Sequence, residues 1–109
     1  MNLTEIDDGV FVCGQITAAC VAELAKAGFK AIICNRPDNE EANQPAFREI
    51  EECANKYGMK CYYIPVTPPH IEENSIKHMA EALKSCEYPL LAYCKSGRRA
   101  QTLYQLAKK

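Results

Sequence analysis

A cysteine and an arginine with four residues between them, Cys94 and Arg99, stand between an apolar run and a helix-forming segment. The apolar residues 90–93 are typical of a strand, residues 100–103 of the start of a helix, and Gly97 lies in the short loop. The backbone N–H groups of such a loop and the N-terminus of the following helix supply positive potential. That potential stabilises a thiolate, the reactive form of cysteine, and an arginine fork grips an oxyanion through two hydrogen bonds. The pattern predicts an anion cradle around a nucleophilic cysteine.

Each residue of this loop has an expected part. We predict that Cys94 is the nucleophile and that Arg99 binds the anion, while Arg98 lies at the rim because two arginines cannot both point into so short a loop. Ser96 either places its hydroxyl near the thiolate or only closes the turn. The alternative is that Cys94 is one more buried cysteine, on a loop that at most binds an anion. The predicted anion-binding residues are Lys95, Ser96, Gly97, Arg98 and Arg99.

Length and charge exclude several classes of protein. The chain has 109 residues and a formal net charge of −1. We expect one domain, residues 1–109, with one modest core. The near-neutral charge gives no support to nucleic-acid or membrane-surface binding, and no apolar run is long enough to span a bilayer. The acidic N-terminal residues lack an apolar signal core, so we expect a cytoplasmic protein.

The chain contains seven cysteines, none of them in a C-x-x-C pair, and only two histidines. A structural zinc site therefore has few ligands to use, and the regular strand and helix patterns argue against a disulfide scaffold. We expect no metal and no organic cofactor. Cys34 and Cys13 each end a predicted strand, so either could be a resolving thiol for an oxidised Cys94, although a buried strand cysteine is the simpler interpretation.

Strand and helix patterns alternate along the chain. β-branched apolar runs indicate buried parallel strands, and apolar residues at helical spacing indicate amphipathic helices. This alternation is typical of an α/β fold with a mainly parallel sheet of about four strands flanked by helices. The predicted strands cover residues 9–14, 30–35, 60–64 and 89–93, and the predicted helices cover residues 18–27, 45–57, 76–83 and 99–109.

Functional residues of a parallel sheet lie at the carboxyl ends of its strands. Asp38 follows one of these ends and is the candidate acid, although Arg36 and Asp38 could instead pair with each other, or cap the next helix. Glu40 and Glu41 most simply form a solvated face. The loops expected on this one rim are residues 35–39, 65–74 and 94–99.

Five short motifs occur in order: residues 14–17, 28–30, 35–38 with 40–41 and 44–45, 64–66, and 94–99. Together they resemble the bacterial beta-lactamase-hydrolase-like, phosphatase-like domain family over nearly the whole chain. The resemblance implies a compact dual-specificity protein-tyrosine-phosphatase-like fold. Family members are described as phosphatase-like and as sulfurtransferase-like, and some are fused to persulfide-handling metallo-hydrolase domains. Tyr93 replaces the usual His before the cysteine and Ala100 the usual Ser or Thr after the arginine, so two groups that help to keep the cysteine ionised are missing.

Loop length and the available acid distinguish phosphate-ester cleavage from sulfur transfer. Tyrosine phosphatases have five residues between cysteine and arginine, whereas four residues with Gly97 among them resemble the rhodanese sulfurtransferases. Cleavage of a phosphate ester also benefits from an acid that protonates the leaving alcohol, and the chain has no aspartate after Asp38. Sulfur transfer needs no acid, because sulfite or a thiolate leaves as a stable anion.

We therefore predict a cysteine-dependent sulfurtransferase with thiosulfate or a persulfide as the anionic donor and a thiol as the acceptor. The alternative is a protein-tyrosine-phosphatase-like phosphatase that forms a phosphocysteine from a phosphoester, with Asp38 or a rim glutamate as the acid. A third hypothesis is a non-catalytic anion-binding module. All three need Cys94 and Arg99 at one small anionic ligand.

Overall fold

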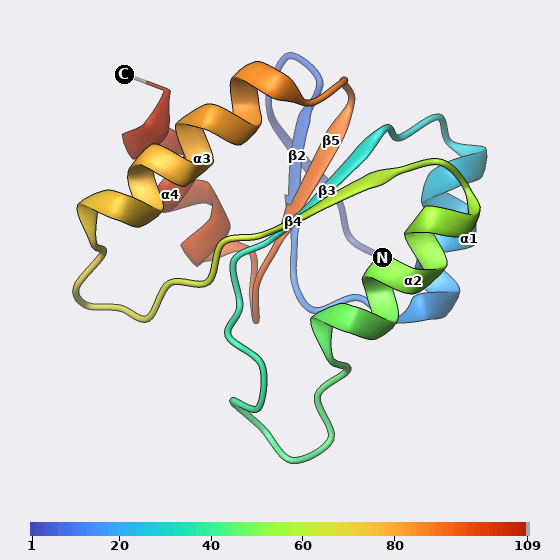
Figure 1. Cartoon of the computed structure of the whole chain (residues 1–109), viewed down its shortest axis with the longest axis horizontal. Coiled ribbons are helices and arrows are strands. Elements are labelled where there is room, and N and C mark those ends of the chain that lie inside the picture. Colours follow the sequence, from blue (N-terminus) through green and yellow to red (C-terminus); the bar gives the residue numbers. More distant parts are fainter. Residues whose placement is uncertain (109) are drawn as a thin grey trace.

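The computed structural model describes residues 1–108 and contains five strands and four helices within them. Figure 1 shows their arrangement. In chain order the elements are β1 (Thr4–Asp7), β2 (Val10–Cys13), α1 (Ala18–Lys26), β3 (Ala31–Cys34), α2 (Phe47–Lys56), β4 (Lys60–Tyr63), α3 (Glu73–Ser85), β5 (Leu90–Tyr93) and α4 (Arg98–Ala107).

The strands form one sheet in the order β1-β2-β5-β3-β4. Strands β2, β5, β3 and β4 run parallel, and β1 pairs antiparallel with β2. Every residue of the central strands β3 and β5 is buried, because helices cover both faces of a parallel sheet. The predicted α/β class with a mainly parallel sheet is confirmed, but the predicted number of about four strands was one too low.

The missing strand is β1, an edge strand joined to β2 by a tight turn. Its sequence, TEID, leaves three of its four side chains exposed. A half-exposed edge strand shows no run of apolar residues, so its periodicity gives little signal. Gly9 makes the turn with φ of +74°, a conformation that glycine adopts without steric cost. The strand was therefore absent from the prediction for a physical reason.

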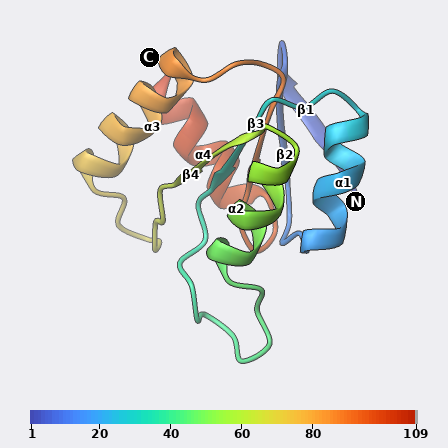
Figure 2. The ribbon, with the colours of Figure 1, turned by 45° about the vertical axis from the view of Figure 1, so that its right-hand side comes forward.

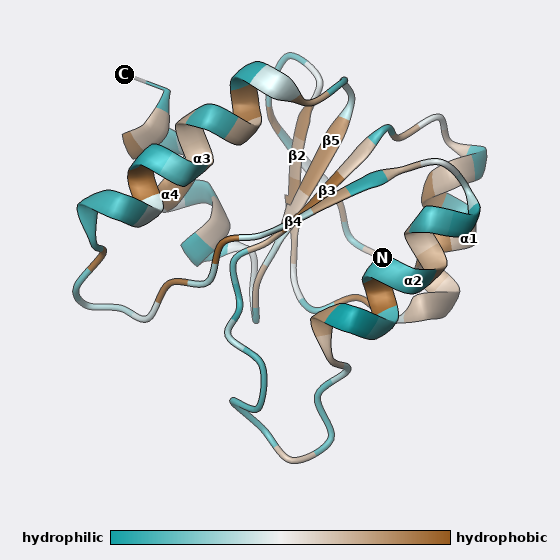
Figure 3. Cartoon of the chain, viewed as in Figure 1, coloured by the Kyte–Doolittle hydropathy of each residue, from teal (hydrophilic) through white to brown (hydrophobic). Residues whose placement is uncertain are grey.

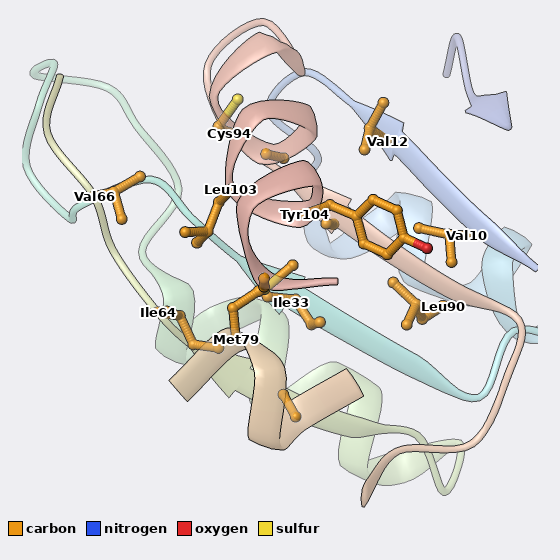
Figure 4. Packing of buried hydrophobic residues seen from close by; sticks show 14 of the residues in the cluster. Val10, Val12, Ile33, Ile64, Val66, Met79, Leu90, Cys94, Leu103 and Tyr104 are labelled. Carbon is orange, nitrogen blue, oxygen red and sulfur yellow. The ribbon is translucent and has the colours of Figure 1, made fainter. Parts of the chain in front are cut away.

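The helices form two layers on opposite faces of the sheet. Helices α1 and α2 pack together on one face, and α3 and α4 on the other (Figures 1 and 2). Each helix turns its apolar side towards the strands and its polar side outward (Figure 3). Leu24 and Ile50 are buried on the first face. Met79 and Leu103 are buried on the second (Figure 4).

Helix bounds differ from the predicted ones by a few residues. Helix α2 begins at Phe47 rather than residue 45, since Ala46 has extended backbone angles. Helix α3 begins at Glu73, inside the predicted loop 65–74, and α4 begins at Arg98 directly after Gly97. The predicted end of the last helix, residue 109, lies outside the described residues. None of these shifts moves a predicted site residue away from the carboxyl edge of the sheet.

The three loops expected on one rim do meet there. The guanidinium of Arg99 donates to the Val66 carbonyl and to the Glu40 carboxylate, which brings together the segments after β5, β4 and β3. The long connection between β3 and α2 extends away from the carboxyl edge of the sheet in both views (Figures 1 and 2). The topology therefore positions the candidate site at this edge.

None of the helices in residues 1–108 combines the length and apolarity needed to cross a membrane. Nor do three or more His, Cys, Asp or Glu side chains in that range gather in a way that could hold a metal ion.

Candidate functional site

Cys94 follows the last residue of β5, and its sulfur lies beneath the loop that leads into α4. The residue is 1% exposed and packs in the same cluster as Val66 and Leu103 (Figure 4). The backbone N–H of Gly97 donates a hydrogen bond to Sγ at 3.0 Å. Hydrogen bonds from N–H groups strengthen when their acceptor is ionised. The loop therefore places a backbone donor directly on the sulfur of Cys94.

Glycines allow this loop to approach the end of β2 closely. Gly97 has φ of +95°, and a β carbon there would lie 3.2 Å from the carbonyl carbon of Cys13. A β carbon on Gly14 would lie 2.8 Å from the carbonyl oxygen of Lys95. The N–H of Cys94 donates to the Cys13 carbonyl at 3.3 Å. The two backbones thus touch where a larger residue would push them apart.

The first turn of α4 adds further donors. The N–H of Gln101 donates to the Gly97 carbonyl at 3.1 Å, so the N–H groups of residues 98–100 come before the first such bond of the helix. The N–H of Arg98 has a weak contact with Ser96 Oγ at 3.4 Å. This end of the helix carries the positive pole of its dipole and suits an anion.

Arg99 is held in place by two partners and keeps one edge of its guanidinium available. Its Nη1 donates to Glu40 Oε2 at 2.9 Å and to the Val66 carbonyl at 3.0 Å, and its Nη2 approaches Glu40 Oε1 at 3.4 Å. A guanidinium has five N–H donors. The donors without an acceptor in residues 1–108 are Nε–H and one N–H of Nη2, which lie on the same edge and can grip an oxyanion as a fork.

A second arginine lies buried behind this contact. Arg36 is 3% exposed and donates to Glu40 Oε1 at 2.9 Å, to Glu41 Oε1 at 2.6 Å and to Gln15 Oε1 at 3.0 Å. Lys95 Nζ lies 3.6 Å from Glu41 Oε1. Both glutamates are exposed, as predicted for a solvated face, but they also join three cations of the rim, which was not predicted.

These ion pairs fix the charge of both carboxylates. Burial alone would raise the pKa of Glu40, but the hydrogen bonds from Arg99 and Arg36 outweigh it and lower that pKa below its usual value. The hydrogen bond from Arg36 and the nearby charge of Lys95 lower the pKa of Glu41. Both side chains are therefore ionised at neutral pH and are poor proton donors.

Asp38, the predicted acid, binds the backbone at the start of α2. Its Oδ1 accepts the N–H of Phe47, the first residue of α2, at 2.9 Å, and its own N–H donates to the Tyr63 hydroxyl at 3.0 Å. This is the helix-capping alternative weighed above, and the pairing of Arg36 with Asp38 does not occur, since Arg36 contacts the glutamates. No hydrogen bond within residues 1–108 joins Asp38 to the Cys94 loop.

The remaining predicted anion-binding residues divide into two groups. Gly97 contributes its buried N–H to the sulfur. Lys95, Ser96 and Arg98 are exposed at the rim, and Lys95 faces Glu41. The side chain of Arg98 makes no hydrogen bond or ion pair within the described residues, in contrast to Arg99.

The two other strand-end cysteines lie on the opposite face of the sheet from Cys94. Cys13 and Cys34 belong to the cluster beneath α1 and α2, whereas Cys94 belongs to the cluster beneath α3 and α4. Burial raises the pKa of both thiols, to about 12 for Cys13. The Cys34 thiol donates to the Arg36 carbonyl at 3.2 Å. This placement argues against the resolving-thiol hypothesis and favours buried strand cysteines.

The two departures from the resembled family differ in their surroundings. Tyr93 packs in the cluster beneath α1 and α2, because successive side chains of a strand point to opposite faces. Its hydroxyl is therefore on the other side of the sheet from the Cys94 sulfur. Ala100 is fully buried beside Leu103 and supplies no hydroxyl to the loop. The structure compensates for neither missing group at those two positions.

Comparison with known proteins gives a family match over residues 2–109, to the phosphatase-like domain of beta-lactamase hydrolase-like proteins. A beta-lactamase hydrolase-like protein from Agrobacterium fabrum is 37% identical over 108 residues. That match covers 99% of this chain and 25% of the relative, so the chain spans about a quarter of the length of the curated relatives it matches. The family resemblance seen in the sequence is confirmed.

Solved structures agree on the fold. A candidate phosphatase from Neisseria meningitidis superposes with a TM-score of 0.86 at 34% identity, covering 95% of this chain and 74% of that one. A variant of TpbA from Pseudomonas aeruginosa in complex with phosphotyrosine has a TM-score of 0.67 at 15% identity, covering 94% and 59%. A kinase-associated phosphatase whose catalytic-site cysteine is replaced by serine has a TM-score of 0.66 at 15% identity, covering 92% and 67%. The tyrosine-phosphatase-like fold is thus confirmed.

Gly97→Ala tests the close approach of the loop to β2. We expect a loss of about 1–3 kcal/mol in the free energy of unfolding from the positive φ, and a further loss from the contact with Cys13. Gly58→Ala is the matched control, because Gly58 also has a positive φ but its β carbon would meet nothing within 4 Å. Urea unfolding of both variants should show the greater loss for Gly97→Ala. Equal losses would contradict the described packing.

Glu40→Gln tests the charge network through its pH dependence. Because the folded state lowers the pKa of Glu40, this carboxylate stabilises the fold above its ordinary pKa of about 4.5, and that stability is lost as the pH falls through the folded value. The wild type should therefore exceed Glu40→Gln in stability at pH 6, and the gap should narrow towards pH 3. Thermal unfolding across that range measures it.

The control for this experiment is Glu52→Gln, which removes the exposed ion pair with Arg48 on α2. Exposed pairs contribute little to stability, so a small effect is expected at every pH. A stability gap for Glu40→Gln that stays constant from pH 6 to pH 3 would show that its ion pairs are absent in solution.

Proposed function

This chain belongs to the phosphatase-like domain family of beta-lactamase hydrolase-like proteins, and we propose that it is a cysteine-dependent phosphatase domain acting on a small anionic phosphoester. The single observation that carries the proposal is the hydrogen bond from the Gly97 N–H to Cys94 Sγ, at the start of a helix and beside the held guanidinium of Arg99. A thiolate, oriented amides and a positive fork are the parts that attack on a phosphoryl group requires.

In the proposed reaction the Cys94 thiolate attacks phosphorus. The S–P bond forms as the bond from phosphorus to the ester oxygen breaks, and the leaving group departs with its electron pair. Water then attacks the phosphocysteine, the S–P bond breaks, and phosphate and the thiolate are released. The Arg99 side chain and the free N–H groups of residues 99 and 100 would carry the charge of the phosphoryl oxygens.

The leaving group in this proposal departs without help from a protein acid. Asp38 caps α2, and Glu40 and Glu41 are kept ionised by Arg36, Arg99 and Lys95. A leaving group that is stable as an anion, such as a phenolate, therefore suits the site better than an alkoxide. The fold neighbour in complex with phosphotyrosine, itself an aryl phosphate, accords with this choice.

Sulfur transfer remains a second candidate because of two specific observations, the four residues between Cys94 and Arg99 and the engaged acids. In that reaction the thiolate attacks the outer sulfur of thiosulfate, an S–S bond forms, and sulfite leaves with its electron pair. An acceptor thiolate then attacks the persulfide and restores Cys94. The family match and the phosphatase neighbours favour the phosphatase proposal over this one.

Cys94→Ser separates these reactions. We expect wild-type protein to release phosphate from p-nitrophenyl phosphate and Cys94→Ser to lose at least about 1,000-fold of that rate, since a nucleophile is removed. The same pair should be assayed for sulfite release from thiosulfate with a thiol acceptor. Cys94-dependent sulfite release without phosphate release would put the second candidate first. If neither product forms, the domain is a non-catalytic module.

Arg99→Ala and Arg98→Ala form a matched pair for anion binding. Arg99→Ala removes the guanidinium that Glu40 and Val66 hold and should weaken binding of inorganic phosphate about tenfold to a hundredfold. Arg98→Ala removes an exposed side chain and should weaken that binding less than about threefold. Isothermal titration with inorganic phosphate measures both. Equal losses would show that Arg98, and not Arg99 alone, lines the cradle.

A further inference from the structure

A cleft of about 360 Å³ lies directly beside the candidate site, between the first turn of α4 and the segment that follows β4. One wall is apolar and consists of Pro68, Pro69 and Ile71. The other wall consists of Ser96, Arg98, Arg99 and Thr102. Such a volume is at the lower end of the range for small-molecule sites, and it is more than twice the cavity of about 150 Å³ that holds a benzene ring.

The charges of this cleft have one sign. Its lining contains two arginines and no carboxylate. Arg99 is the residue proposed to hold the reacting anion, and its guanidinium is fixed by Glu40 and Val66. Arg98 differs, because its side chain has no hydrogen-bond or ion-pair partner within residues 1–108, while Arg36, Lys95 and Arg99 all share the two glutamates. The cleft thus holds a positive charge that no carboxylate of the described chain balances.

The apolar wall and the unbalanced charge line the same space and come from two different segments of the chain. A flat ring suits the proline and isoleucine wall, since such a surface buries apolar area without needing a hydrogen-bond partner. An anionic substituent on that ring would meet the planar fork of Arg98. The reacting phosphoryl group would remain at Arg99, one residue away on the same helix turn.

We propose that this cleft binds the leaving group of the substrate, and that the leaving group is an aromatic ring carrying a second anionic group such as a carboxylate. The assignment rests on the proposed function, because it takes the Cys94–Arg99 loop as the place of reaction. It deepens that function by naming the substrate class, an aryl phosphate with a further negative charge. Arg98 becomes a specificity-determining residue whose side chain contributes little to the binding of inorganic phosphate.

The test compares two ligands of matched size and different charge. The probes are 3-carboxyphenylphosphonate and 3-carbamoylphenylphosphonate, which lack a scissile ester bond and are titrated calorimetrically against Cys94→Ser. The carboxylate should bind about threefold to tenfold more tightly than the amide, the range of one exposed charged hydrogen bond. In Cys94→Ser with Arg98→Gln added, the two affinities should agree within about twofold. The control substitution, Lys26→Gln, removes an exposed cation on α1 on the other face of the sheet and should preserve the preference.

A second variant tests the apolar wall. Ile71→Ala should weaken binding of phenylphosphonate about twofold to fivefold while binding of inorganic phosphate stays the same, because only the ring contacts this wall. The thermal midpoint of Ile71→Ala is measured beside it, since Ile71 also packs against the core. If Ile71→Ala unfolds at the assay temperature, the comparison of Arg98→Gln with Lys26→Gln decides alone.

The outcomes separate this inference from the proposed function. If Cys94→Ser loses phosphate release but the carboxylate shows no preference that depends on Arg98, the cleft assignment is overturned and the proposed function stands. If the preference depends on Arg98 but no phosphoester is cleaved by the wild type, the ligand class is supported and the phosphatase proposal fails. Loss of the preference in Lys26→Gln would also overturn the assignment, because it would then reflect overall charge.

Discussion

The hydrogen bond from the Gly97 N–H to the Cys94 sulfur is the contact on which the rest of the site depends. It exists only because Gly97 takes a left-handed conformation against the carbonyl carbon of Cys13, where a β carbon would sit 3.2 Å away. The same turn starts α4 and directs its free N–H groups to the carboxyl edge of the sheet. Strand β5, the loop and the helix therefore act as one unit that places a backbone donor on the sulfur.

A second constraint is the balance of charge around this unit. Glu40 pairs with both Arg36 and Arg99, and Glu41 with Arg36 and Lys95, so two carboxylates hold three cations of the rim. The network ties the segment after β3 to the segment after β5. It leaves Arg99 with one free edge and keeps the glutamates ionised, which limits them as acids. The ion pairs that position Arg99 are therefore also the reason that the two glutamates are poor proton donors.

The sequence predicted the parts that local patterns encode. The buried runs at β3 and β5 and the loop between Cys94 and Arg99 were located from apolar periodicity, glycine and residue type. Strand β1 was missed because an exposed edge strand has no apolar run. The role of Glu40 was missed because its partner Arg99 is 59 residues away along the chain, and only the fold brings them together. The proximity of Arg36 to Glu40 and Glu41, four and five positions further on, was the local signal for that network. The preference for sulfur transfer rested on loop length and on the lack of an aspartate after Asp38, whereas the family match and the neighbours favour phosphatase chemistry.

The most direct test of the account is the alkylation rate of Cys94 within the intact protein. Iodoacetate at pH 7 is an anion that reacts with thiolates, and peptide mapping follows all seven cysteines in one sample. Burial raises the pKa of Cys13 and of Cys61 to about 12, so these two serve as internal references for unreactive thiols. The account predicts that Cys94 is alkylated faster than both and that inorganic phosphate slows this reaction alone. A rate at Cys94 no higher than at Cys61, unchanged by phosphate, would contradict it.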